Sequence, residues 1–589
     1  MAGLEVTVLL GIAILVGTAL APRLRIATPL VLVVIGLLLG FVPALRDIQL
    51  PPETVLLLFL PVMLFWESLT TSLRAVRRSL RYIVPMSTLL VVASAFAVAW
   101  IATLFGVPFH TALLLGAAVA PPDATAVAAL GRLLPERMFM KLKAESLTND
   151  GTALVLYAIA LSLALGENVT GWSITGMIAV SYLGGAAAGI AVAALAYVLL
   201  RRAHHALVIN TTLLLVPFVA FLLAEIIGAS GVLAVVFAGL IVAWSHARIT
   251  TATSRRQALS AWPFGVYLLN GALFVLIGLE VQYVVHDVPA RQLGILVVIT
   301  IATWIALIVV RYLFQLLFAP FSRPSGAPRF GHHRGRVVNT FAGFRGAVSL
   351  AIALSVPASV AGIGEPGELT GRDIVVFVTG GVILLSLLVQ GPLLPAIVRW
   401  ARLPADESAA DEYELAQRTI TGAAVAALDD LAAEHGISNE VRDRARRETY
   451  EYLELANARA YARQSRADAA SIAELETMLG APDTSGDAAG AVAGANPVAL
   501  TAAPAVAASP AAPLEMIATS DGIDLTQRSP ITRFEEATRL RLAVLDRKRA
   551  VLQRLRREGT IDDLVVRRIE GHLDIDELRL RGLDQADGA

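Results

Sequence analysis

The first 400 or so residues of this 589-residue chain are a succession of apolar stretches, separated by glycine, proline and charged residues. A membrane-spanning helix needs about 20 predominantly apolar residues, and most of these stretches approach or exceed that length. The stretches lie at about 4–20, 27–43, 53–72, 82–105, 109–130, 142–165, 172–200, 207–227, 230–246, 262–281, 291–318, 337–360 and 372–399. The sequence therefore predicts an all-α integral membrane protein with thirteen transmembrane helices.

The loops between these stretches differ sharply in basic content. The odd-numbered loops hold about nineteen Arg and Lys residues and the even-numbered loops about three, and basic residues accumulate on the cytoplasmic side. The N-terminus is therefore expected outside and the C-terminus in the cytoplasm. Lys occurs only at positions 141, 143 and 548, while Arg and Ala are abundant. Such usage is typical of a GC-rich bacterial genome, so we expect a multi-pass protein of the bacterial plasma membrane.

Composition excludes several classes of function. The formal net charge is zero, which gives no electrostatic bias toward nucleic acid. The chain has no cysteine, which excludes disulfides, thiolate zinc sites, iron–sulfur clusters and cysteine nucleophiles. No phosphate loop, metal triad or nucleophile motif stands at the end of a span. We therefore expect neither an enzyme nor a bound cofactor.

The last third of the chain has a different character. A transmembrane domain over 1–402 gives way to charged, amphipathic sequence predicted to form helices over 403–480 and 516–589. Between them, 481–515 is rich in Ala, Pro and Gly, lacks the large side chains needed for a core, and is expected to be a disordered linker. The helical stretches of this tail could form a regulatory domain that binds a partner, a dimerisation element, or a segment without a function of its own.

The sixth predicted span carries the richest cluster of polar residues. Residues four apart share a helix face, so Glu145 lies beside Asn149 and Ser146 beside Asp150. One helix thus presents two carboxylates, an amide and a hydroxyl together. Such oxygen ligands suit protons and hard monovalent cations. Because ionisable residues inside a membrane are costly, we expect this cluster to be functional.

Two other predicted spans are interrupted. Pro121 and Pro122 break span five next to Asp123, and Gly343 and Gly346 loosen span twelve around an arginine. Spans five and twelve are corresponding members of two six-helix halves with opposite topology. This pattern predicts an inverted-repeat secondary transporter whose site lies where the broken helices cross.

Two arginines lie inside predicted spans and need acidic partners. For Arg345 we expect Glu145 first and Asp123 second, because an unpaired intramembrane guanidinium would be very costly. For Arg311 in span eleven, Glu280 near the end of span ten is the expected partner in a structural bridge.

Three motifs, in order within the expected spans, resemble the cation:proton antiporter superfamily, in its sodium/proton exchanger branch with an Asn-Asp pair. They are ESLTNDG at 145–151, GAAVAPPDA at 116–124 and FRGAV at 344–348, and the resemblance covers about 5–400. It implies that Asp150 binds the transported cation or a proton, that Asn149 replaces a second Asp of electrogenic relatives, and that the protein is a homodimer.

The chain also departs from that family pattern. Pro122 stands where Thr is usual and Ala124 where Pro is usual, so Thr125 or Ser146 would supply the missing oxygen. Glu67 in span three either lines the cytoplasmic funnel or sits at a helix end.

The predicted function is electroneutral, alternating-access exchange of a monovalent cation, Na⁺ first, for H⁺ across the plasma membrane, serving pH homeostasis. One carboxylate neutralises one positive charge, which predicts competition at Asp150. Potassium/proton exchange on the same scaffold remains open, as do a sodium-coupled symporter for an organic solute and a cation channel.

Overall fold

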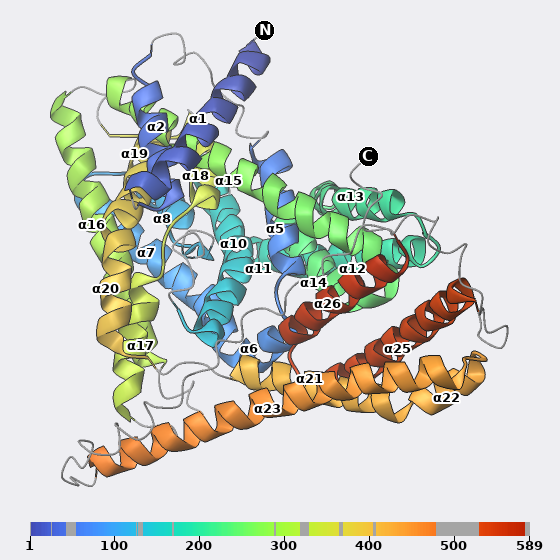
Figure 1. Ribbon diagram of the computed structural model, residues 1–589. Coiled ribbons are helices and arrows are strands. Elements are labelled where there is room, and N and C mark those ends of the chain that lie inside the picture. Colours follow the sequence, from blue (N-terminus) through green and yellow to red (C-terminus); the bar gives the residue numbers. More distant parts are fainter. Residues whose placement is uncertain are drawn as a thin grey trace. The chain divides into compact units, whose positions relative to one another are not determined.

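The computed structural model describes residues 2–24, 26–42, 55–124, 127, 134–167, 170–287, 290–318, 329–357, 359–363, 369–403, 408–478 and 529–582. Every regular element in these ranges is a helix, apart from one isolated backbone bridge. The predicted all-α class is therefore confirmed for the described residues (Figure 1).

The chain divides into two compact units. The first comprises Met1–Ala409 with Asp562–Asp574, and the second comprises Ala410–Ile561 with Ile575–Ala589. The linker predicted at 481–515 lies outside the described residues. The predicted division into a membrane domain and three tail segments stays a prediction.

The first unit contains the apolar helices. They are α1 (Ala2–Leu24), α2 (Thr28–Leu39), η1 (Val55–Phe59), α5 (Leu60–Leu69), α6 (Leu73–Ser87), α7 (Leu89–Leu104), α8 (Phe109–Val119), α10 (Glu136–Ala164), α11 (Gly171–Ala179), η2 (Val180–Gly184), α12 (Gly185–Leu200), α13 (Ala206–Ile226), α14 (Gly231–Ile249), α15 (Ala252–Asp287), α16 (Ala290–Leu317), α17 (Arg329–Phe341), α18 (Ala347–Leu354), α19 (Gly371–Leu385), η3 (Ser386–Gln390) and α20 (Gly391–Ala401).

Eight helical stretches among the described residues are long and apolar enough to cross a membrane. Four shorter apolar helices coincide with other predicted spans: Thr28–Leu39, Leu57–Leu69, Phe109–Val119 and Gly231–His246. The one remaining predicted span, the twelfth at 337–360, is shared between α17 and α18. Each predicted span thus contains helix, while the count of thirteen crossings and the inverted repeat stay predictions.

Polar residues determine where two of the helices begin. Helix α10 begins at Glu136, ahead of the predicted start, because the charged residues before Glu145 are good helix formers. Helix α19 begins with a capping box in which Thr370 and Asp373 bond each other's backbone N–H groups.

The described helices of the first unit surround two large apolar cores. One core draws residues mainly from α2, α7, α8, α10, α15, α16, α18 and α19, and the other mainly from α5, α12, α13 and α14. Helices α2 and α15 approach so closely that a Cβ at Gly36 would overlap the Val275 carbonyl, and one at Gly278 would overlap the Val33 carbonyl. Only glycine permits this spacing.

The first unit also includes the start of α26 (Asp563–Leu580). Arg255 at the start of α15 forms a bidentate ion pair with Asp574, with N–O distances of 2.6 and 2.5 Å. In the turn between α5 and α6, the Ser72 hydroxyl donates to Asp562 (3.1 Å), and the Thr71 carbonyl accepts from Arg567 (3.0 Å). Residues 562–574 are thus fixed to the apolar helices at two places.

The second unit contains α21 (Ser408–Ala426, apart from its first two residues), α22 (Leu428–Glu434), α23 (Asn439–Met478), α25 (Pro530–Glu558) and the end of α26. Its core includes Leu428, Val441 and Leu540. Helices α23 and α25 are also joined by the Arg541–Glu448 ion pair, at 2.8 Å. The helices predicted in the tail are therefore present in the described residues.

Candidate functional site

The two predicted interruptions lie in direct contact. Helix α8 ends at Val119, and α17 and α18 are separated by the segment that contains Phe344. The backbone N–H of Asp123 donates to the carbonyl of Phe344 at 2.7 Å, in an antiparallel bridge. In Figure 1, α8 and α18 can be followed to this region. A backbone donor in one interruption is thus satisfied by a backbone acceptor in the other.

Gly346 is part of this contact for a steric reason. A Cβ atom at Gly346 would overlap the Asp123 carboxylate. The carboxylate therefore lies against the bare backbone of the other interruption, and the glycine is required for the close approach.

Arg345 is buried, with 4% of its surface exposed, and it donates to backbone carbonyls. Its guanidinium bonds the carbonyls of Val119 (2.9 Å), Gly343 (2.5 Å) and Ala120 (3.4 Å). The C-terminal carbonyls of a helix lack partners within the helix and carry partial negative charge. The predicted Glu145–Arg345 pair is wrong, because the end of α8 supplies the acceptors that an acid was expected to supply.

Glu145 pairs instead with Arg311. The two N–O distances are 2.5 and 3.1 Å, and both side chains are almost fully buried. Arg311 also donates to the Asn339 carbonyl at 3.1 Å. Among the described residues Arg311 makes no bond to Glu280, so that predicted pairing is wrong as well. Arg311 pairs with Glu145 because the fold brings their helices within reach of each other, and apolar periodicity does not predict which helices lie close together.

Helix α10 brings the predicted polar face to the interruption. Asn149 donates from Nδ2 to the Pro122 carbonyl at 2.8 Å, and the Ser146 hydroxyl accepts from the Ala124 N–H at 3.2 Å. Both side chains are buried. The backbone that the prolines leave non-helical is therefore held by two side chains of α10.

Asp150 is buried, with 5% of its surface exposed. No side chain or backbone group among the described residues hydrogen-bonds to its carboxylate. The Asn149 side-chain carbonyl is buried and also lacks a partner there. The carboxyl groups of Asp123 and Glu67 lie within electrostatic range of Asp150. Within the described part of the chain, the site thus combines a buried acid without a hydrogen-bond partner and an adjacent carbonyl oxygen without one.

Glu67 lies on α5 and is partly buried. In the same region Lys143 donates to the Thr70 hydroxyl at 2.6 Å. Thr125, which we expected to contribute an oxygen, lies outside the described residues. In the part of the chain that the structure describes, no group of three or more His, Cys, Asp or Glu side chains could hold a resident metal ion.

A hydrogen-bonded chain beside the ion pair was not anticipated. Asn339, whose carbonyl accepts from Arg311, donates from its side chain to the Tyr82 hydroxyl at 2.8 Å. Helices α6, α16 and α17 are linked in this way. A Tyr near one predicted span start and an Asn near another carry no signal of contact, so sequence reasoning could not have found them.

Comparison with known proteins supports the resemblance. The family described as "Sodium/hydrogen exchanger, transmembrane" matches residues 10–400. The chain is 36% identical to the uncharacterized Na⁺/H⁺ exchanger Rv2287 of Mycobacterium tuberculosis, over 99% of this chain and 97% of that protein. It is 30% identical to the Na⁺/H⁺ antiporter ApNhaP of Aphanothece halophytica, over 66% of this chain and 72% of the relative.

A solved structure has the same fold. The sodium proton antiporter MjNhaP1 of Methanocaldococcus jannaschii, determined at pH 8, aligns with a TM-score of 0.52 at 19% identity, covering 68% of this chain and 99% of that one. The chain therefore belongs to the sodium/hydrogen exchanger family and is a multi-pass membrane transporter, a cation/proton antiporter and not an enzyme.

Proposed function

We propose that this protein exchanges one Na⁺ for one H⁺ by competition at Asp150. The observation that carries the proposal is the buried Asp150 carboxylate, which has no hydrogen-bond partner among the described residues. A buried carboxylate is costly unless a proton or a cation compensates its charge. One carboxylate compensates one positive charge, so binding of Na⁺ and binding of H⁺ exclude each other.

The neighbouring oxygens suit a hard monovalent cation. The Asn149 carbonyl oxygen has no partner in the described chain, and the Ser146 hydroxyl lies on the same face of α10 as Asp150. Carboxylate, amide and hydroxyl oxygens are the donors that such cations prefer. In this proposal Asp123 shapes the crossing, while the Glu145–Arg311 pair and the carbonyl-bound Arg345 are structural supports.

Alternating access is proposed to occur between two bundles. The bundle that carries spans four to six and eleven to thirteen would move against the remainder around a fixed site, as in other inverted-repeat transporters. A plasma-membrane location, an external N-terminus, a cytoplasmic tail and a homodimer complete the proposal.

Potassium is the second candidate cation. A relative from Bacillus pumilus, 29% identical over 63% of this chain and 58% of its own length, is named a sodium, potassium, lithium and rubidium/H⁺ antiporter. Cations of different size are therefore exchanged by proteins similar to this one.

The first test is Asp150→Asn, assayed as cation-driven proton flux in everted vesicles with Na⁺, Li⁺ and K⁺ added singly. Because Asn keeps the shape but cannot take up a proton, exchange is expected to fall to the background of empty vesicles while the protein still folds and inserts. Asp411→Asn, at an exposed position on α21, is the matched control and is expected to retain flux. Flux retained in Asp150→Asn would refute the assignment.

The second test, Asn149→Asp, examines the stoichiometry. A second carboxylate is expected to bind a second proton, so that transport becomes sensitive to membrane voltage. Flux is measured in proteoliposomes with and without an imposed potential. If the variant transports without voltage dependence, Asn149 does not set the stoichiometry, and one-for-one exchange loses this support.

A further inference from the structure

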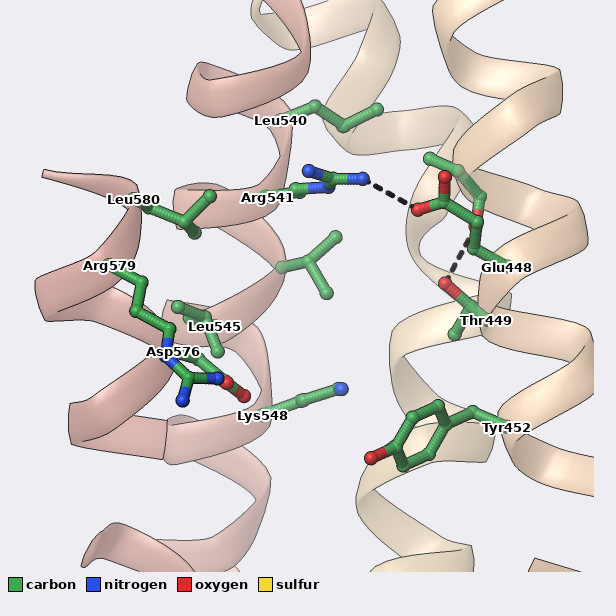
Figure 2. A pocket seen from close by; sticks show the side chains of 12 residues that line it. Glu448, Thr449, Tyr452, Leu540, Arg541, Leu545, Lys548, Asp576, Arg579 and Leu580 are labelled. Atoms are coloured by element: carbon green, nitrogen blue, oxygen red, sulfur yellow. Dashed lines mark hydrogen bonds and ion pairs between the residues drawn. The ribbon is translucent and has the colours of Figure 1, made fainter. Parts of the chain in front are cut away.

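A cavity of about 390 Å³ lies within the second unit. It is formed by α23, α25 and the last turns of α26 (Figure 2). Its size falls within the usual range for small-molecule sites, about 300–1,000 Å³. No part of the exchange site lines it.

The lining combines apolar and charged side chains. Leu540, Leu545 and Leu580 supply apolar surface, and three basic and two acidic side chains supply charge. Arg541 of α25 donates to Glu448 of α23 at 2.8 Å, so this acid is already neutralised. The charged lining residues that remain are Lys548, Arg579 and Asp576, so the lining has one more basic than acidic side chain.

Lys548 is the unusual group in this lining. It is the only lysine outside α10 in a chain that otherwise uses arginine. Figure 2 shows its side chain extending from α25 into the gap toward α23, where Tyr452 points back toward it. No ion pair of its ammonium is found within the described residues. Burial lowers the pKa of Lys548, and Asp576 opposes this effect only in part.

We propose that this cavity binds a small organic anion, a carboxylate or phosphate on an apolar or aromatic body. The Lys548 ammonium would bond the anionic group, since charge-assisted hydrogen bonds are strong where water is partly excluded. The Tyr452 ring and the leucine side chains would contact the body. Arg579 adds a further positive charge to the lining and is not required as the direct donor.

Binding is tested by calorimetry on the purified full-length protein. Adenosine monophosphate represents the phosphate class and benzoate the carboxylate class, while adenosine tests the uncharged body. Saturable binding of either anion, with adenosine weaker, is expected, and the anion that binds identifies the class. If neither anion binds saturably in the millimolar range, the proposal is overturned.

Substitution then locates the bound anion. Lys548→Gln is expected to weaken binding by about tenfold or more, because it removes the charged donor. Arg547→Gln removes a neighbouring exposed charge on α25 and is expected to leave the affinity unchanged. Equal affinity in Lys548→Gln and the unchanged chain would overturn the proposal. Transport is not needed for this assay, so its outcome is independent of the proposed exchange mechanism.

The pH profile gives a second readout. The groups that face Lys548 are Glu448 and Tyr452 from α23, Arg541 from α25, and Asp576 and Arg579 from α26. The ammonium is charged below its pKa, so affinity is expected to fall as the pH rises through that value, at a lower pH than for an ordinary lysine. Lys548→Arg stays charged and is expected to bind at high pH. The same loss of affinity with rising pH in Lys548→Arg would show that a group other than Lys548 titrates, and it would contradict the proposal.

Discussion

Glu145 and Arg311 are each buried in a region where an isolated charge would be costly. Their bidentate contact at 2.5 and 3.1 Å compensates both charges and orients the guanidinium toward the Asn339 carbonyl. Arg345, only a few residues beyond Asn339, reaches the same end by a different route, through carbonyls at the end of α8. At this scale two identical side chains are stabilised by different kinds of acceptor.

Glu145→Gln is expected to lower the thermal stability of the purified protein strongly. The substitution leaves the Arg311 charge buried without an acid, and breaking a buried pair in this way costs about 3–5 kcal/mol. Unfolding is followed in detergent as loss of monodisperse protein on heating.

The double variant Glu145→Gln/Arg311→Met is the matched control, since it removes both charges and is expected to recover most of the stability. Pairing Glu145→Gln with Arg345→Met is expected to give no recovery. If stability recovered with Arg345→Met and not with Arg311→Met, Glu145 would pair with Arg345, as the sequence suggested.

At the scale of elements, the sequence predicted which helices are interrupted better than it predicted which residues are in contact. Proline removes backbone donors and glycine relaxes the backbone, so breaks at Pro121–Pro122 and around Phe344 follow from residue type alone. The Asp123–Phe344 bridge and the Asn149–Pro122 bond depend on how separate helices pack. Periodicity identifies the buried face of a helix but not the neighbour that covers it.

The role assigned to Asp150 illustrates the same limit. A carboxylate in an uncharged run indicates a functional residue because burial is costly. Whether its oxygens are already bonded by neighbours depends on tertiary structure, and only the structure shows them without partners in the described chain. The cation ligands and their number stay predictions.

Gly346→Ala tests the contact between the two interruptions. The new Cβ would overlap the Asp123 carboxylate, so either this side chain or one of the two backbone segments has to shift. Exchange activity is expected to fall at least about tenfold, because small displacements of a positioned group are costly to function. Flux in everted vesicles is the measurement. Gly335→Ala, on α17 with ample space, is the control and is expected to keep its activity. Full activity in Gly346→Ala would show that the close approach is not required.

At the scale of the whole molecule, the two units do not follow the order of the chain. Residues 562–574 group with the apolar helices although the preceding stretch, Ala410–Ile561, belongs to the second unit. The contacts responsible join positions far apart in sequence, namely Arg255 with Asp574 and Ser72 with Asp562. No local pattern predicts such an assignment, because charged amphipathic helices look alike wherever they dock.

Asp574→Asn is expected to loosen residues 562–574 from the first unit. The Arg255–Asp574 pair is mostly buried, with 11% and 7% of the side chains exposed, and a hydrogen bond to a charged group contributes about 1.5–3 kcal/mol. Amide hydrogen exchange across 562–574 should therefore accelerate by about tenfold or more. Asp546→Asn, at a position 78% exposed on α25, should leave this exchange unchanged. The charge-reversed double variant Arg255→Asp/Asp574→Arg should restore much of the protection. If residues 562–574 exchange as slowly in Asp574→Asn as in the unchanged chain, the ion pair is not needed to keep this segment bound to the first unit. The hydrogen bonds at Ser72 and Thr71 would then be sufficient.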